Sequence, residues 1–102
     1  MKKYILKGKT PVVENDIIKW GKWFGTANRH VKEDIIKGIH ISTVFLGINH
    51  NFVGGKPILF ETRIFGGEHN DYQERYHTLE EAEDGHEKAV ELVKKGKNEN
   101  KK

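Results

Sequence analysis

The chain has 102 residues and a formal net charge of +3, with 35% hydrophobic and 32% charged residues. This length suits a single domain, and the absence of cysteine excludes disulfides and thiolate metal sites. Since no apolar run approaches the length of a membrane-spanning helix, we expect no membrane association and a location in the cytoplasm.

The amino-terminal third is predicted to contain one strand and one helix. Residues 4–6 are hydrophobic and are followed by lysine and glycine, which is typical of a short strand. Asn15 is a suitable N-cap for a helix over residues 16–24, in which apolar side chains recur at steps of three and four. Residues 26–37 are polar and irregular, and we expect a loop or a continuation of the helix there.

Two apolar segments in the middle of the chain are predicted to pair as an antiparallel hairpin. Residues 39–48 first alternate in polarity and then become apolar on both sides, which is typical of a strand that enters the middle of a sheet. Residues 58–65 form the second strand. The intervening residues 49–57 are rich in loop-forming residues, and the chain is expected to reverse at Gly54 and Gly55.

A third antiparallel strand over residues 72–77 is expected to pair with the second strand of this hairpin. The length of the turn between them predicts that Arg63 lies opposite Glu74. The same register predicts that Glu61 lies opposite Tyr76, so that these two side chains share one face of the sheet.

The final helix has the most distinct local signal in the chain. Thr78 and Glu81 form a capping box, in which each side chain bonds to a backbone N–H near the other residue. The helix is expected to end at Gly96, and residues 97–102 are predicted to be a disordered basic tail. The final nine residues carry five lysines and Glu99, a charge of +4, so the rest of the chain is close to neutral at −1. The apolar stripe of the helix consists of Leu79, Ala82, His86, Ala89, Val90 and Val93.

The predicted order over residues 1–96 is strand, helix, strand, strand, strand, helix. This order favours a single α+β domain, in which an antiparallel sheet of three to four strands carries two helices on one face. The other face of the sheet is only partly polar. It must therefore contact solvent, a ligand or a second subunit, and we expect a homo-oligomer.

Three strings of residues are distinctive: WGKWF at residues 20–24, TVFLG at residues 43–47 followed by His50, and LFETRIFGG at residues 59–67. With these strings the chain resembles a family of small uncharacterised proteins from phages and prophages, over nearly its whole length up to about residue 93. The resemblance implies a mobile-element origin and the cytoplasm of a bacterial host, where such accessory proteins redirect or block host systems. It brings no known activity and no functional residue with it.

Seven side chains are candidates for a ligand-binding site. The two tryptophans are three residues apart on the first helix and can flank one groove, which glycine at position 21 would open to a ligand. The arginines could grip a phosphate and the tyrosine could stack on a base, as a polar floor for an anionic or nucleotide ligand. In the alternative, Glu61 pairs with Arg75 and Arg63 pairs with Glu74. The candidates are Trp20, Trp23, His50, Glu61, Arg63, Arg75 and Tyr76.

The six histidines are scattered, and none is spaced for a zinc site on one helix, so no metal or other cofactor is predicted. An alternative is a metal site assembled from loops, with His50, His69 and Glu61 as ligands. His86 lies on the apolar stripe of the last helix, where we expect a neutral core imidazole that is hydrogen-bonded to Glu61 or Tyr76.

The lack of catalytic motifs, the surplus of aromatic side chains and the family resemblance predict a non-enzymatic binding protein. It would block or sequester a host factor, either a host defence protein or a small signalling nucleotide. One alternative is a small metal-dependent hydrolase or nuclease that uses His and Glu residues. The other is a nucleic-acid-binding protein that combines the lysine tail with exposed aromatic side chains.

Overall fold

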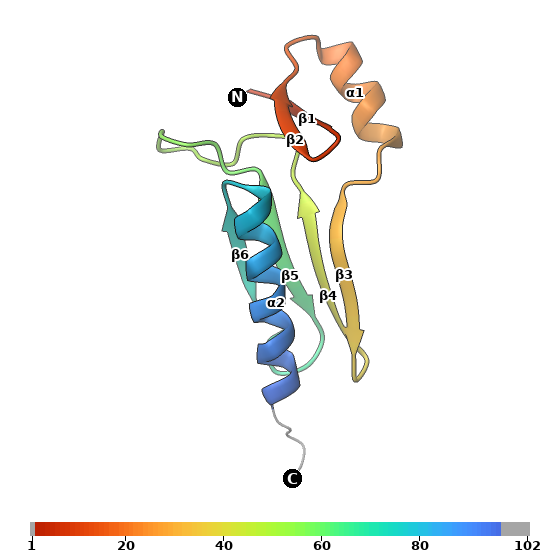
Figure 1. The fold of residues 1–102 in the computed structure, drawn as a ribbon, viewed down its shortest axis with the longest axis vertical. Helices are drawn as coiled ribbons and strands as arrows, with labels where there is room; N and C mark the ends of the chain where they lie inside the picture. Colours follow the sequence, from red (N-terminus) through yellow and green to blue (C-terminus); the bar gives the residue numbers. More distant parts are fainter. Residues whose placement is uncertain (1, 97–102) are drawn as a thin grey trace.

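The computed structural model describes residues 2–96, so the tail predicted at residues 97–102 lies outside the described residues (Figure 1). The described part forms two sheets and two helices. The elements in chain order are β1 (Tyr4–Lys7), β2 (Thr10–Val13), α1 (Ile17–Thr26), β3 (His30–Ile36), β4 (Ile39–Phe45), β5 (Phe60–Phe65), β6 (Gln73–Tyr76) and α2 (Leu79–Lys95).

The architecture is α+β, which confirms the predicted class. The main sheet has four antiparallel strands in the order β3-β4-β5-β6, and β1 pairs with β2 in a separate two-stranded sheet. Figure 1 shows α2 lying along the main sheet, where it contacts all four strands. The first helix, α1, lies beside β1 at one end of the molecule. Of the two described helices, only α2 therefore packs along the main sheet, whereas two helices were expected on that face.

Strand β3 is the main element that the sequence pattern did not reveal, because residues 30–36 were expected to be a loop or helix. A β-bulge between His30 and Lys32 shifts the pairing with β4. In the regular part of the strand, the positions that face α2 hold the charged side chains of Lys32 and Asp34, so polar and apolar positions do not alternate. Strands β3 and β4 are joined by Lys37 and Gly38, which have φ of 54° and 80°. Two positive φ values in a two-residue loop are the geometry that matches the twist of a tight hairpin.

The pairing of β4 with β5 is confirmed, but the predicted pairing of β5 with β6 is wrong by one residue. Glu61 lies opposite Arg75, whereas Arg63 lies opposite Gln73. Because neighbouring residues of a strand point to opposite faces, this shift separates Glu61 from Tyr76. Tyr76 lies opposite Phe60 and both side chains belong to the core, while Glu61 points away from α2.

The core lies between the main sheet and α2. One cluster joins Ile41 and Ile64 of the sheet to the carboxyl-terminal half of α2, and a second is centred on the fully buried rings of Phe45 and Phe60. The capping box at the start of α2 is confirmed, since Thr78 and Glu81 exchange the expected hydrogen bonds. The N-cap of α1 is Asp16, one residue after the predicted Asn15, and its carboxylate accepts bonds from two backbone N–H groups.

Candidate functional site

The two tryptophans hold α1 in place. The indole N–H of Trp20 donates to the carbonyl oxygens of Tyr4 at 3.1 Å and Gly47 at 3.0 Å. The ring of Trp23 meets the edge of Phe45 at a centroid distance of 5.8 Å and packs against the second core cluster. A Cβ placed on Gly21 would have no neighbour within 4 Å, so no other part of the described chain approaches this glycine closely. Both tryptophan rings contribute to the attachment of α1 to the rest of the fold.

Three of the other candidates, Glu61, Arg63 and Arg75, lie together on the side of the main sheet that α2 leaves uncovered, which we call the open face. Its members are the side chains that alternate with the core positions along β3 to β6. They are His30, Glu33, Ile35, His40, Ser42, Val44, Glu61, Arg63, Phe65, Gln73 and Arg75.

The centre of the open face is a satisfied ion pair. The Nε of Arg75 donates to Glu61 Oε2 at 3.0 Å, and the side-chain amide of Gln73 donates to the same oxygen. Glu61 is only 8% exposed, so these neighbours largely replace water around its carboxylate. The alternative in which Glu61 pairs with Arg75 is therefore confirmed.

The exposed part of the open face combines apolar side chains with the guanidinium of Arg63. The guanidinium of Arg63 lies 5.5 Å from the ring centre of Phe65, whose other neighbour is the His40 ring at 6.0 Å. Phe65 is 44% exposed and Ile35 is 70% exposed. The sequence analysis did not single out either apolar side chain, and for Ile35 the strand that contains it was not recognised. The predicted pair of Arg63 with Glu74 is wrong, since Glu74 alternates to the other face.

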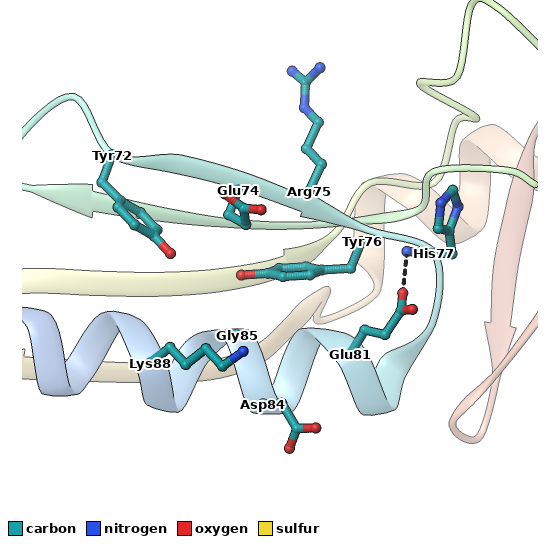
Figure 2. Close-up of a pocket in the computed structure, with 9 residues that line it drawn as sticks. All are labelled: Tyr72, Glu74, Arg75, Tyr76, His77, Glu81, Asp84, Gly85 and Lys88. Atoms are coloured by element: carbon teal, nitrogen blue, oxygen red, sulfur yellow. Dashed lines mark hydrogen bonds between the residues drawn. The ribbon is translucent and has the colours of Figure 1, made fainter.

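Tyr76 is separated from the arginines by the sheet, so the predicted floor of Arg63, Arg75 and Tyr76 does not form. Figure 2 shows Tyr76 and Tyr72 directed toward each other between β6 and α2, while the Arg75 side chain points away from them. They line a cleft of about 550 Å³. The other residues that line it are mostly polar or charged, namely Glu74, Arg75, His77, Glu81, Asp84, Gly85 and Lys88.

Burial raises the pKa of both Tyr72 and Tyr76 above the ordinary value of 10.0, and the contact of Tyr76 with Thr62 lowers its pKa by less. The folded protein therefore keeps protons that the unfolded chain releases near pH 10. The contribution of the two tyrosines to the free energy of unfolding is fully present below that pH, and it is lost as the pH rises toward their pKa values in the folded protein. We expect urea unfolding between about pH 9 and pH 12 to show this loss, and the Tyr72→Phe, Tyr76→Phe variant to show a flatter profile. An unchanged slope would contradict the assignment.

His86 is fully buried and joins α2 to the sheet through two hydrogen bonds. Its Nδ1 lies 2.7 Å from Thr43 Oγ1, and its Nε2 lies 2.8 Å from Asp34 Oδ2. The predicted partners Glu61 and Tyr76 are therefore wrong. This order of hydroxyl, imidazole and carboxylate resembles a nucleophilic triad, but the hydroxyl is fully buried and the carboxylate is the exposed end. A substrate cannot reach the hydroxyl, so the network is structural.

His50 lies in the connection between β4 and β5, away from the open face. Its Nδ1 lies 2.8 Å from the carbonyl oxygen of Ile48, and its ring centre is 6.1 Å from that of Phe52. Within residues 2–96, no three His, Cys, Asp or Glu side chains are grouped so that they could hold a metal ion. The alternative metal site of His50, His69 and Glu61 is therefore not assembled.

Comparisons with known proteins do not extend this description. No family model, curated protein or solved structure matches the chain. In the described part of the chain, neither helix is both long and apolar enough to cross a membrane. The surfaces of the molecule, and chiefly its open face, are therefore the guide to its function.

Proposed function

We propose that the chain is a non-enzymatic binding protein and that its open face contacts a protein partner. The observation that carries the proposal is the combination of exposed Ile35 and Phe65 with the guanidinium of Arg63 on one rigid sheet surface. Aromatic and arginine side chains are enriched at the energetic centres of protein interfaces. The surrounding polar side chains are already paired, so a partner can cover them without stranding a charge.

The charge of the open face favours a protein partner over an anionic nucleotide or nucleic acid. Binding to phosphates depends on cations that are free to replace counterions. Here Arg75 is neutralised by Glu61, and His40 faces Glu33. A face with balanced charge lacks the positive potential that draws phosphates to a surface.

The resemblance to phage and prophage proteins supports a bacterial host factor as this partner, with blocking of that factor as the mode of action. A blocking protein needs a complementary surface and no chemistry of its own. The enclosed His86 network is consistent with this, since its hydroxyl is inaccessible to a substrate. A second copy of the chain is the other protein that the open face could contact.

The proposal is tested with a double variant of the open face, Ile35→Glu with Phe65→Glu. Its matched control is Ile17→Glu with Ile18→Glu, which places the same two charges on side chains that are 64% and 67% exposed on α1. The partner recovered with the tagged protein from bacterial cells is purified and titrated against all three proteins. We expect the open-face variant to bind about 30-fold more weakly and the control to bind normally.

Melting curves of the two variants establish that both remain folded, which is expected because the substituted side chains are exposed. Equal binding by the open-face variant and the wild type would remove the proposal. Self-association that disappears only in the open-face variant would identify a second copy as the occupant of this face.

A further inference from the structure

The connection between β4 and β5, which we call the β4–β5 loop (residues 46–59), projects from the body of the molecule (Figure 1). Its tip carries the adjacent side chains of Phe52 and Val53, which are 71% and 97% exposed. Neither side chain contributes to the core clusters or to the open face. Large apolar side chains gathered on a protrusion are a common mark of an interaction surface.

Two asparagine side chains hold this tip in one conformation. Asn49 Oδ1 accepts hydrogen bonds from the backbone N–H of Asn51 at 2.8 Å and of Ile58 at 3.0 Å. The amide of Asn51 then bridges the tip, since its Nδ2 donates to the Lys56 carbonyl at 2.7 Å and its Oδ1 accepts from Val53 N at 3.1 Å. The turn between these contacts is therefore fixed from both sides.

The base of the loop is attached to the rest of the fold. His50 N donates to the Ile58 carbonyl at 3.0 Å, and the ring of His77 lies 2.9 Å from the Pro57 carbonyl. At the tip, Gly54 and Gly55 have φ of 96° and 94°, which other residues rarely adopt. A loop held in this way has little conformational entropy left to lose on binding, so it presents Phe52 in a preorganised position.

We infer that Phe52 and Val53 form an apolar finger that inserts into a concave apolar pocket on a protein partner. A convex tip with an aromatic ring fits a pocket and not a flat surface. The β4–β5 loop contains Lys56 and no carboxylate, so the rim of that pocket is expected to be acidic. This contact is separate from the open face and does not depend on the function proposed for it.

Other occupants fit the finger less well. Stable attachment to a lipid surface requires a longer apolar face or several cations, whereas the loop offers two apolar side chains and a single lysine. A second copy offers the cleft between β6 and α2, lined with Glu74, Asp84 and Lys88, and a shallower hollow along α2. The second hollow is lined by four charged side chains and one apolar one, namely Glu87, Lys88, Glu91, Lys95 and Leu92. Either site would bury charges against the Phe52 ring. A protein of different sequence is therefore the occupant that the chemistry favours.

The test uses the full chain with p-benzoylphenylalanine, a photo-crosslinker, in place of Phe52, and the same substitution at Ile17 as a control on an equally exposed apolar side chain. After irradiation in bacterial cells, mass spectrometry identifies the cross-linked peptide. We expect a protein adduct that forms from position 52 and not from position 17. The adduct should map to an apolar pocket of that protein, with Asp or Glu side chains at its rim.

The cross-linked protein is then purified and its affinity for variants is measured. Phe52→Ala is expected to weaken binding roughly tenfold or more. Asn51→Ala is expected to weaken it by a smaller factor, because this substitution loosens the tip of the loop but retains the Phe52 ring. Adducts with lipid or with a second copy, equal adducts from both positions, or unchanged affinity of Phe52→Ala would each overturn the inference. Loss of binding in the Ile35→Glu, Phe65→Glu variant alone would overturn it and leave the function of the open face standing.

Discussion

Replacing His86 by alanine is expected to lower the free energy of unfolding by about 3–5 kcal/mol, the cost typical of removing a large core side chain. His86 is fully buried, and its ring fills the space between α2 and the sheet. The truncation opens a cavity there. It also leaves the Thr43 hydroxyl buried and without its imidazole partner, which adds a desolvation cost. Urea unfolding of the variant and the wild type at the same pH measures the difference.

The two ends of the His86 network are expected to differ. Thr43→Val keeps the shape of a fully buried side chain but removes its bonds to His86 and to Thr62, for a loss of about 1–3 kcal/mol. Asp34→Asn keeps an acceptor for His86 Nε2 on a side chain that is 44% exposed, so its cost is below about 1 kcal/mol. If Asp34→Asn were as damaging as Thr43→Val, the exposed end would be the critical one and the structural assignment would be wrong.

The network also explains why the open face can serve as a platform. The hydroxyl oxygens of Thr62 and Thr43 lie 2.5 Å apart. The chain of polar contacts therefore runs from Thr62 on β5 through Thr43 on β4 and His86 on α2 to Asp34 on β3. Polar contacts buried in a core are strong when every member has a partner, and they fix the position of the elements that they join. Three strands of the main sheet are thereby held to α2, and the side chains on their opposite surface keep a fixed spacing.

The elements predicted correctly are those whose signals lie within one segment. The capping box of Thr78 and Glu81 is complete within four residues, and it marks the start of α2 in the structure as it does in the sequence. The apolar runs of β4 and β5 are each long enough to identify a central strand, and the two strands pair as predicted, with Ile41 opposite Ile64 in the structure. In these places, local propensity and the final packing agree.

The features that could not be predicted depend on contacts between distant segments. In β3 the positions that face α2 are the charged Lys32 and Asp34, so the strand lacks the usual alternation and only its pairing with β4 reveals it. The attachment of α1 depends on the bonds from Trp20 to Tyr4 and Gly47, which no local pattern encodes. The largest error in the candidate site came from the predicted register of β5 and β6. The observed register differs by one residue, which places Tyr76 and Glu61 on opposite sides of the sheet.

Replacing Gly85 by alanine is expected to destabilise the fold by about 3 kcal/mol, because the added methyl group overpacks the interface between α2 and β6. A Cβ at position 85 would lie 2.1 Å from the Tyr76 hydroxyl oxygen and 2.3 Å from Cζ of the same ring. Tyr76 is only 9% exposed, so its ring has to move into the cleft between β6 and α2 to relieve the clash. The loss of packing outweighs the roughly 1 kcal/mol that alanine gains over glycine in a helix.

The matched control is Gly21→Ala in α1, where a Cβ meets nothing within 4 Å and the residue is exposed. There the helix propensity acts alone, and we expect a stabilisation of up to about 1 kcal/mol. The same gain should appear at Gly85 when the ring is absent: in a Tyr76→Ala background, Gly85→Ala is expected to stabilise the protein. This change of sign depends on the one contact between Gly85 and Tyr76. If Gly85→Ala were destabilising in both backgrounds, the contact with Tyr76 would not be its cause.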